Sequence, residues 1–165
     1  MAIPLQKRKL LGCAGWFLLS FATAAVGARA SIDAQVFYSQ LVQPDWAPPA
    51  WLFGPVWTFL YLLMAVSASL VWLSGGWRAR RGELGLFLAQ LVLNGLWSWL
   101  FFAWHLGGLA FAEIVLLWGA VCATVIAFWR TRPLAGMLLV PYLLWVTFAA
   151  VLNFAVWQLN PQSLG

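Results

Sequence analysis

The chain has 165 residues, of which 64% are hydrophobic and only 8% are charged, with a mean hydropathy of +0.89. A soluble domain is about half apolar and about one quarter charged, and a chain this short cannot bury such an excess in its own core. The composition therefore excludes a soluble globular domain, a disordered chain and a disulfide-stapled secreted domain. The net charge of +5 comes from few, scattered basic residues, so nucleic-acid binding is not indicated. We predict an integral membrane protein, whose first partner is the lipid bilayer.

Five apolar segments are long enough to cross a bilayer, which takes about 20 helical residues. In chain order they cover about residues 10–28, 53–74, 84–104, 109–129 and 134–158. Each segment is too long and too continuous for a barrel strand, and backbone in lipid must satisfy its own hydrogen bonds. The predicted fold class is therefore an all-α integral membrane protein, a bundle of five transmembrane helices in one domain over residues 1–165.

The first segment also has features of a secretory signal peptide, with basic residues before it and Ala28-Arg29-Ala30 at its end. Its apolar run of about 18 residues is long for such a signal. We favour a retained transmembrane helix.

A long loop, about residues 29–52, follows the first helix and carries apolar side chains on a stiff backbone. Pro44, Pro48 and Pro49 fix φ and remove backbone donors, so this part of the loop cannot be helical. Two interpretations remain open. The loop, with Tyr38 and Trp46, is either a lid over the bundle or an aromatic belt at the membrane interface.

Basic residues predict the orientation of the chain in the membrane. Eight of the nine precede the first helix or lie in the second and fourth connections: Lys7, Arg8, Lys9, Arg78, Arg80, Arg81, Arg130 and Arg132. The opposite side holds only Arg29. Because basic loops stay in the cytoplasm, we expect the N-terminus inside, the C-terminus outside and the long loop outside.

Polar side chains inside the helices are sparse and share faces with aromatic ones. The shared faces hold Trp57 and Tyr61 in the second helix, Gln90, Asn94, Trp97 and Phe101 in the third, and Tyr142, Trp145, Ala149 and Asn153 in the fifth. A single buried amide most often joins two helices. Three such faces beneath one stiff loop favour a mostly apolar ligand cavity with a few oriented polar groups.

Other kinds of site find little support in the sequence. The single histidine, His105, cannot form a metal or paired haem site, and no phosphate-binding loop is present. Glu113 is the only acid well inside a predicted span, and a proton relay usually needs several ionisable groups. We expect Glu113 to face the interface near a helix end, and we predict neither a metal site nor a tightly bound cofactor.

Several motifs carry a family resemblance: Trp46-Ala47-Pro48-Pro49, FGPVWTFLY at 53–61, AQLVLNGLW at 89–97 with Phe101-Phe102, and VPYLLW at 140–145 leading to Leu152-Asn153. In this order and spacing, over about residues 37–160, they resemble the TspO/MBR family. These are the tryptophan-rich sensory proteins of bacteria and the translocator proteins, or peripheral benzodiazepine receptors, of mitochondria. The resemblance implies a five-helix bundle, commonly a homodimer, with a pocket under the first loop for porphyrins, haem, sterols and benzodiazepine-type ligands.

The resemblance also implies roles for individual residues. Trp57, Asn94, Tyr142 and Trp145 match pocket-lining positions, Tyr38 matches a loop tyrosine near the ligand, and Ala149 matches a small position beside the pocket. With the shared faces above, the candidate ligand-binding residues are Tyr38, Trp46, Trp57, Tyr61, Gln90, Asn94, Trp97, Tyr142, Trp145, Ala149 and Asn153.

Three functions stay open on this resemblance. The first is a receptor or translocator that binds tetrapyrroles and related lipophilic molecules, with porphyrin or haem as ligand. The second is light-dependent porphyrin breakdown, with Trp57 and Trp145 as the catalytic residues. The third is a sterol- or lipid-binding regulatory membrane protein.

Two positions depart from the family pattern. Where mitochondrial members carry the tyrosine and arginine of a sterol-recognition motif, this chain has Phe154 and Gln158, which weakens the expectation of cholesterol binding. Trp99 stands where the family usually has proline, so we expect a straighter third helix. A bacterial membrane is favoured over the mitochondrial outer membrane.

Overall fold

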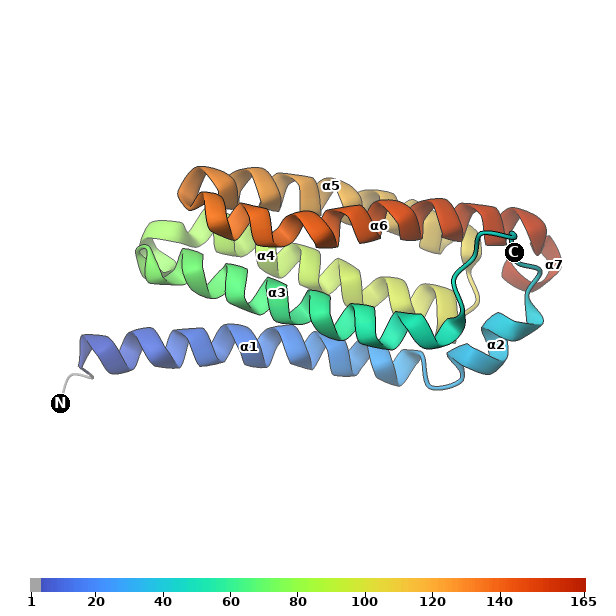
Figure 1. Cartoon of the computed structure of the whole chain (residues 1–165), viewed down its shortest axis with the longest axis horizontal. Helices are drawn as coiled ribbons and strands as arrows, with labels where there is room; N and C mark the ends of the chain where they lie inside the picture. Colours follow the sequence, from blue (N-terminus) through green and yellow to red (C-terminus); the bar gives the residue numbers. More distant parts are fainter. Residues whose placement is uncertain (1–3) are drawn as a thin grey trace.

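Five long helices run along the length of the molecule in a computed structural model that describes residues 4–165 (Figure 1). They are α1 (Leu5–Ala30), α3 (Phe53–Leu73), α4 (Gly76–Ser98), α5 (Gly107–Thr131) and α6 (Pro133–Leu159). Each is long and apolar enough to cross a membrane, and no strand occurs among the described residues. The predicted fold class, an all-α bundle of five transmembrane helices, is confirmed. Residues 1–3 of the predicted domain lie outside the described residues.

Two of the helices begin earlier than predicted. α1 starts at Leu5 and α4 at Gly76, because basic residues lower the hydropathy of a segment without preventing helix formation. The first position of α4 needs a glycine, since Gly76 has φ +68°, a conformation that other residues rarely adopt. α6 begins directly at Pro133, whose missing N–H is tolerated at the first position of a helix.

The third span does not stay regular to its end, so the straightening expected from Trp99 is wrong there. α4 passes into a π-helical turn, η2 (Trp99–Ala103), in which the Trp104 N–H donates to the Trp99 carbonyl at 2.9 Å. Such a turn is wider than an α-helical one. It places Phe101 in the core and leaves Trp104 exposed.

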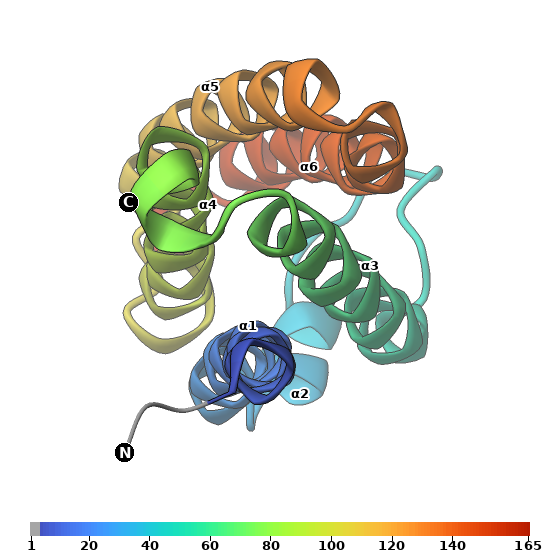
Figure 2. The same cartoon turned by 90° about the vertical axis from the view of Figure 1, so that its left-hand side faces the viewer.

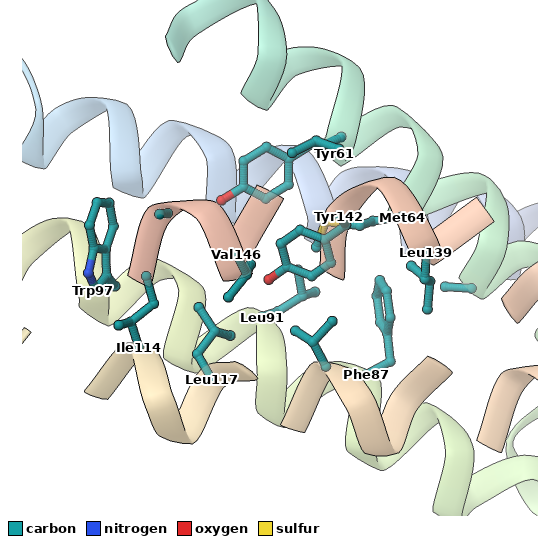
Figure 3. Close-up of a cluster of buried hydrophobic side chains, with 14 of the residues drawn as sticks. Tyr61, Met64, Phe87, Leu91, Trp97, Ile114, Leu117, Leu139, Tyr142 and Val146 are labelled. Carbon is teal, nitrogen blue, oxygen red and sulfur yellow. The ribbon is translucent and has the colours of Figure 1, made fainter. Parts of the chain in front are cut away.

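Viewed from the end, the spanning helices follow one another around the bundle in the order α1, α4, α5, α6 and α3 (Figure 2). α5 and α6 pack along each other, and α1 packs along α3 and α4 on the other side of the bundle. The core lies among α3, α4, α5 and α6, as the cluster in Figure 3 shows. Its largest fully buried side chains include Met64, Phe87, Ile114, Leu117, Leu139 and Tyr142.

The loop between α1 and α3 is partly helical. Residues 41–49 are not helical, as their prolines predict, but Ala34–Gln40 form the short helix α2 and Ala50–Leu52 a 3₁₀ turn, η1, neither of which we predicted. Tyr38 of α2 is buried against the bundle, whereas Trp46 and Trp51 remain 49% and 65% exposed. Tyr38 thus lies where a lid residue would, and the placement of the two exposed tryptophans at the membrane interface stays a prediction.

Asn160, at the end of α6, fastens this loop to the bundle. Its Oδ1 accepts a hydrogen bond from the Val42 N–H at 2.8 Å, and its Nδ2 donates to the Val42 carbonyl at 2.8 Å. Phe37 adds a second attachment, because its ring stacks on His105 with the centroids 3.9 Å apart. Two segments that are 118 residues apart in sequence are thus held side by side.

Replacement of Asn160 by alanine tests this attachment. Asn160→Ala removes both hydrogen bonds to Val42, so we expect the free energy of unfolding to fall by about 1–3 kcal/mol. We also expect residues 41–49 to be cleaved faster in limited proteolysis of the detergent-solubilised protein. Gln158→Ala, which changes an exposed side chain one half-turn earlier, is the control. Equal cleavage of the two variants would contradict the role given to Asn160.

Candidate functional site

A cavity of about 530 Å³ lies under the loop between α1 and α3. Its walls come from α1, α2, α3, α4 and α6, with one residue from each of the turns η1 and η2. The volume is within the range of about 300–1,000 Å³ that small-molecule sites occupy. Most of its lining is apolar or aromatic, as expected for a lipophilic ligand.

Seven of the eleven candidate ligand-binding residues line this cavity: Tyr38, Trp57, Tyr61, Asn94, Trp97, Trp145 and Ala149. They come from four helices, and periodicity had placed six of them on the shared faces of the predicted spans. The structure thus brings most of the predicted residues to one place. The other four, Trp46, Gln90, Tyr142 and Asn153, lie outside the wall.

Gln90 and Tyr142 lie behind the wall in a buried hydrogen-bond network centred on Asn94. The Asn94 Oδ1 accepts a hydrogen bond from the Tyr61 hydroxyl, and its Nδ2 donates to the Tyr142 hydroxyl at 3.0 Å. The Tyr142 hydroxyl in turn donates to the Gln90 Oε1 at 2.8 Å. The rings of Tyr61 and Tyr142 point their hydroxyl groups in the same direction in Figure 3. The side chains of Gln90 and Tyr142, which lie outside the wall, therefore hold Asn94 in position, and Asn94 in turn holds Tyr61.

Asn153 has a similar supporting position next to Trp97. Its Oδ1 accepts a hydrogen bond from the Trp97 Nε1 at 3.0 Å, and its Nδ2 donates to the Gly107 carbonyl at 3.1 Å. The Trp97 ring also stacks on Phe101, with centroids 5.5 Å apart and planes 14° from parallel. These contacts fix the orientation of the Trp97 ring in the wall.

Trp46 is separated from the cavity by one ring. It packs edge-on against Phe148, with the ring centroids 6.0 Å apart. Phe148 packs in turn against Trp145, with the ring centroids 5.4 Å apart. Trp145 itself lines the cavity. Trp46 therefore supports the wall from outside.

Two buried donors of the cavity residues have no hydrogen-bond partner among residues 4–165. They are the Tyr38 hydroxyl and the Trp145 Nε1–H, both of which are buried. Burial raises the pKa of the Tyr38 hydroxyl above its ordinary value, so this group remains a neutral donor at pH 7. Both donors therefore belong to residues of the cavity wall, where they are shielded from water and lack partners.

The wall contributed by α1 was missed by the sequence reasoning. It consists of Phe21, Ala24, Ala25, Gly27 and Ala28, with Ser31 at the end of the helix. Small residues three or four positions apart are the signal that could have indicated it, because they let another helix or a ligand approach closely.

Glu113 does not face the membrane interface as predicted. Its side chain is only 6% exposed, and neither carboxyl oxygen has a hydrogen-bond partner among the described residues. It shares the inward face of α5 with Ala110, Ile114 and Leu117, which are all buried. Distance from the end of a span does not determine which face a residue occupies, and this is why the prediction was wrong.

A matched pair of tyrosine variants tests the network around Asn94. Tyr142→Phe removes the bridge between Asn94 and Gln90 and leaves buried polar atoms unpaired, so we expect a loss of about 1–3 kcal/mol in the free energy of unfolding. Tyr38→Phe removes a buried hydroxyl without a partner, so its free energy of unfolding should equal or exceed that of the unchanged protein. Thermal unfolding in detergent measures both. A smaller loss for Tyr142→Phe than for Tyr38→Phe would contradict the assignment.

Comparison with known proteins adds a second line of information. The chain matches the TspO/MBR family over residues 15–158. It is 46% identical over 127 residues to the tryptophan-rich protein TspO of Chlorobaculum tepidum, covering 76% of this chain and 80% of that protein. The human translocator protein is 40% identical over 126 residues, which are 75% of each chain. The tryptophan-rich sensory protein of Cereibacter sphaeroides is 39% identical over 150 residues, covering 88% and 92%.

Proposed function

We propose that this chain, which belongs to the TspO/MBR family, binds a porphyrin, haem or a related flat lipophilic molecule in the cavity under residues 31–52. The family match and the five spanning helices support an integral, multi-pass membrane protein of the translocator and sensory kind. The observation that carries the ligand proposal is the composition of the wall, where aromatic rings from three helices meet two buried donors without partners.

The aromatic rings favour a flat ligand. Trp57 and Tyr61 lie one turn apart on α3, with their centroids 5.8 Å apart and their planes tilted by 36°. Trp97 and Trp145 contribute further rings from α4 and α6. Aromatic groups prefer offset-stacked or edge-on contacts, both of which a conjugated macrocycle offers over a large area.

The two donors favour a ligand with acceptors at its edge. A buried donor without a partner costs about 1–3 kcal/mol, which a carboxylate of the ligand would recover at Tyr38 and Trp145. The amide of Asn94 has a different part, because Tyr61 and Tyr142 already occupy its Oδ1 and Nδ2. We therefore assign the orientation of the polar edge to Tyr38 and Trp145, and we assign to Asn94 the support of the wall.

Replacement of two alanines of α1 by leucine, one in the cavity wall and one outside it, tests this site. Ala24→Leu places three further carbon atoms in the cavity, so we expect protoporphyrin IX to bind about tenfold more weakly or worse. Ala22→Leu makes the same change two residues earlier, on an exposed position outside the cavity, and should bind as the unchanged protein does. Quenching of tryptophan fluorescence on titration measures both affinities. Equal affinities would contradict the assignment of the cavity.

Light-dependent breakdown of the bound porphyrin by oxygen is a second candidate function. The observation in its favour is that Trp57 and Trp145 line the same cavity and would both contact the ligand.

Illumination in air separates this candidate from binding alone. If it is correct, the Soret band of protoporphyrin IX should bleach faster with the protein than with free tryptophan, and Trp57→Phe/Trp145→Phe should remove the difference. Trp118→Phe is the control, because Trp118 lies in a groove between α5 and α6 and donates to Thr147 at 2.9 Å. Bleaching no faster than with free tryptophan rejects the catalytic function.

A further inference from the structure

The end of the bundle farthest from the long loop carries a charge pattern that the ligand cavity does not use. All eight basic residues of the predicted inner side lie here, at the start of α1, the start of α4 and the α5–α6 connection. Glu83 is the only acidic residue near this end. It bonds Arg80 at 3.2 Å and accepts a hydrogen bond from the Thr131 hydroxyl at 3.2 Å. No other ion pair occurs within the described part of the chain.

Three of these basic residues line a second cavity, of about 410 Å³. Arg8 and Lys9 come from the first turns of α1, and Arg78 comes from the start of α4. Figure 2 looks onto this end of the bundle, where the start of α1 and the α3–α4 turn both face the viewer. The remaining lining consists of residues 72–77, which run from the end of α3 through the turn to the start of α4, and no acidic side chain takes part.

The walls of this cavity are held together by close packing. The ring of Trp72 lies so near Gly12 that a Cβ atom there would come within 2.0 Å of the indole. Trp16 of α1 also contacts Trp72, with the ring centroids 6.4 Å apart. The glycine at position 12 therefore allows α1 and α3 to meet, and this contact keeps Arg8 and Lys9 next to the α3–α4 turn.

We propose that this second cavity binds the phosphate group of an anionic phospholipid in the adjoining leaflet. Guanidinium groups donate parallel hydrogen bonds to phosphate oxygens, and Arg8 and Arg78 supply two such groups without an acidic partner. Clusters of basic residues at the ends of transmembrane helices attract anionic headgroups.

The apolar part of the lining favours a lipid over a free phosphate ion. Trp72, Leu73 and Trp77 lie in the wall beside the basic residues, and Trp77 and Leu73 are exposed. Tryptophan is typical of the headgroup level of a bilayer, where its ring packs on glycerol and the first carbons of the acyl chains. A free ion would use only the basic residues.

Lipid titration of the delipidated full-length protein tests the proposal. In native mass spectrometry from a non-ionic detergent, we expect phosphatidylglycerol to bind about tenfold more tightly than phosphatidylcholine. Arg8→Gln/Arg78→Gln should lower the affinity for phosphatidylglycerol by about tenfold. Arg130→Gln/Arg132→Gln removes the same amount of charge from the same end of the bundle but outside the cavity. This variant should change the affinity for phosphatidylglycerol by less than about twofold.

Three results would overturn the proposal. The first is an equal loss in the two double variants, which would mean diffuse attraction to the whole basic end. The second is the absence of a preference for phosphatidylglycerol. The third is displacement of the lipid by an equal concentration of inorganic phosphate, which would identify a soluble anion as the occupant.

A second variant covers the case in which the glutamine substitutions prevent folding, as judged by the helical circular dichroism signal. Arg8→Lys/Arg78→Lys keeps the charge but loses the paired donors of each guanidinium group. We expect phosphatidylglycerol to bind severalfold more weakly to this variant. An unchanged affinity would show that these guanidinium groups do not hold the phosphate.

Discussion

The side-chain amide of Asn94 joins three of the five spanning helices. From α4 it accepts a hydrogen bond from Tyr61 of α3 and donates one to Tyr142 of α6. Polar groups within a bilayer have no water to bond, so these partners must be found inside the bundle. The network links α3, α4 and α6, and these three helices form much of the wall of the cavity under the loop.

The fourth side of the cavity has a different character. α1 is the least buried of the spanning helices. In its most apolar stretch 17% of the residues are buried, compared with 33–44% in the other four helices. Small residues such as Ala24 and Ala28 face the cavity from this helix, and the loop after it brings Tyr38 over the top. The cavity thus lies between the hydrogen-bonded helices α3, α4 and α6 on one side and the peripheral helix α1 on the other. Asn160 attaches the loop above it to the C-terminal end of α6.

The parts of this structure that depend on local patterns could be predicted from the sequence. Continuous hydropathy located the five helices, and the spacing of Trp57, Tyr61, Asn94 and Trp145 placed aromatic and amide groups on common faces. Periodicity shows which face a residue occupies but not its depth, so Gln90 and Tyr142, predicted as ligand contacts, proved to lie behind the wall.

Features that depend on contacts between distant segments could not be predicted in this way. The hydrogen bonds between Asn160 and Val42 and the placement of Arg8 and Arg78 around one cavity are of this kind. The inward position of Glu113 belongs with them, because it depends on how α5 rotates against its neighbours. The shared faces of the helices already favoured a cavity beneath the loop, and the family resemblance added Tyr38 to its candidate residues.

Photocrosslinking with a diazirine-bearing porphyrin shows directly whether the cavity under the loop is the ligand site. After irradiation of the complex, peptide mass spectrometry identifies the labelled residues. We predict adducts within residues 21–31 of α1 and at Trp57 or Trp145. Labels confined to the groove between α5 and α6, at Phe111, Val115 or Trp118, would contradict the account.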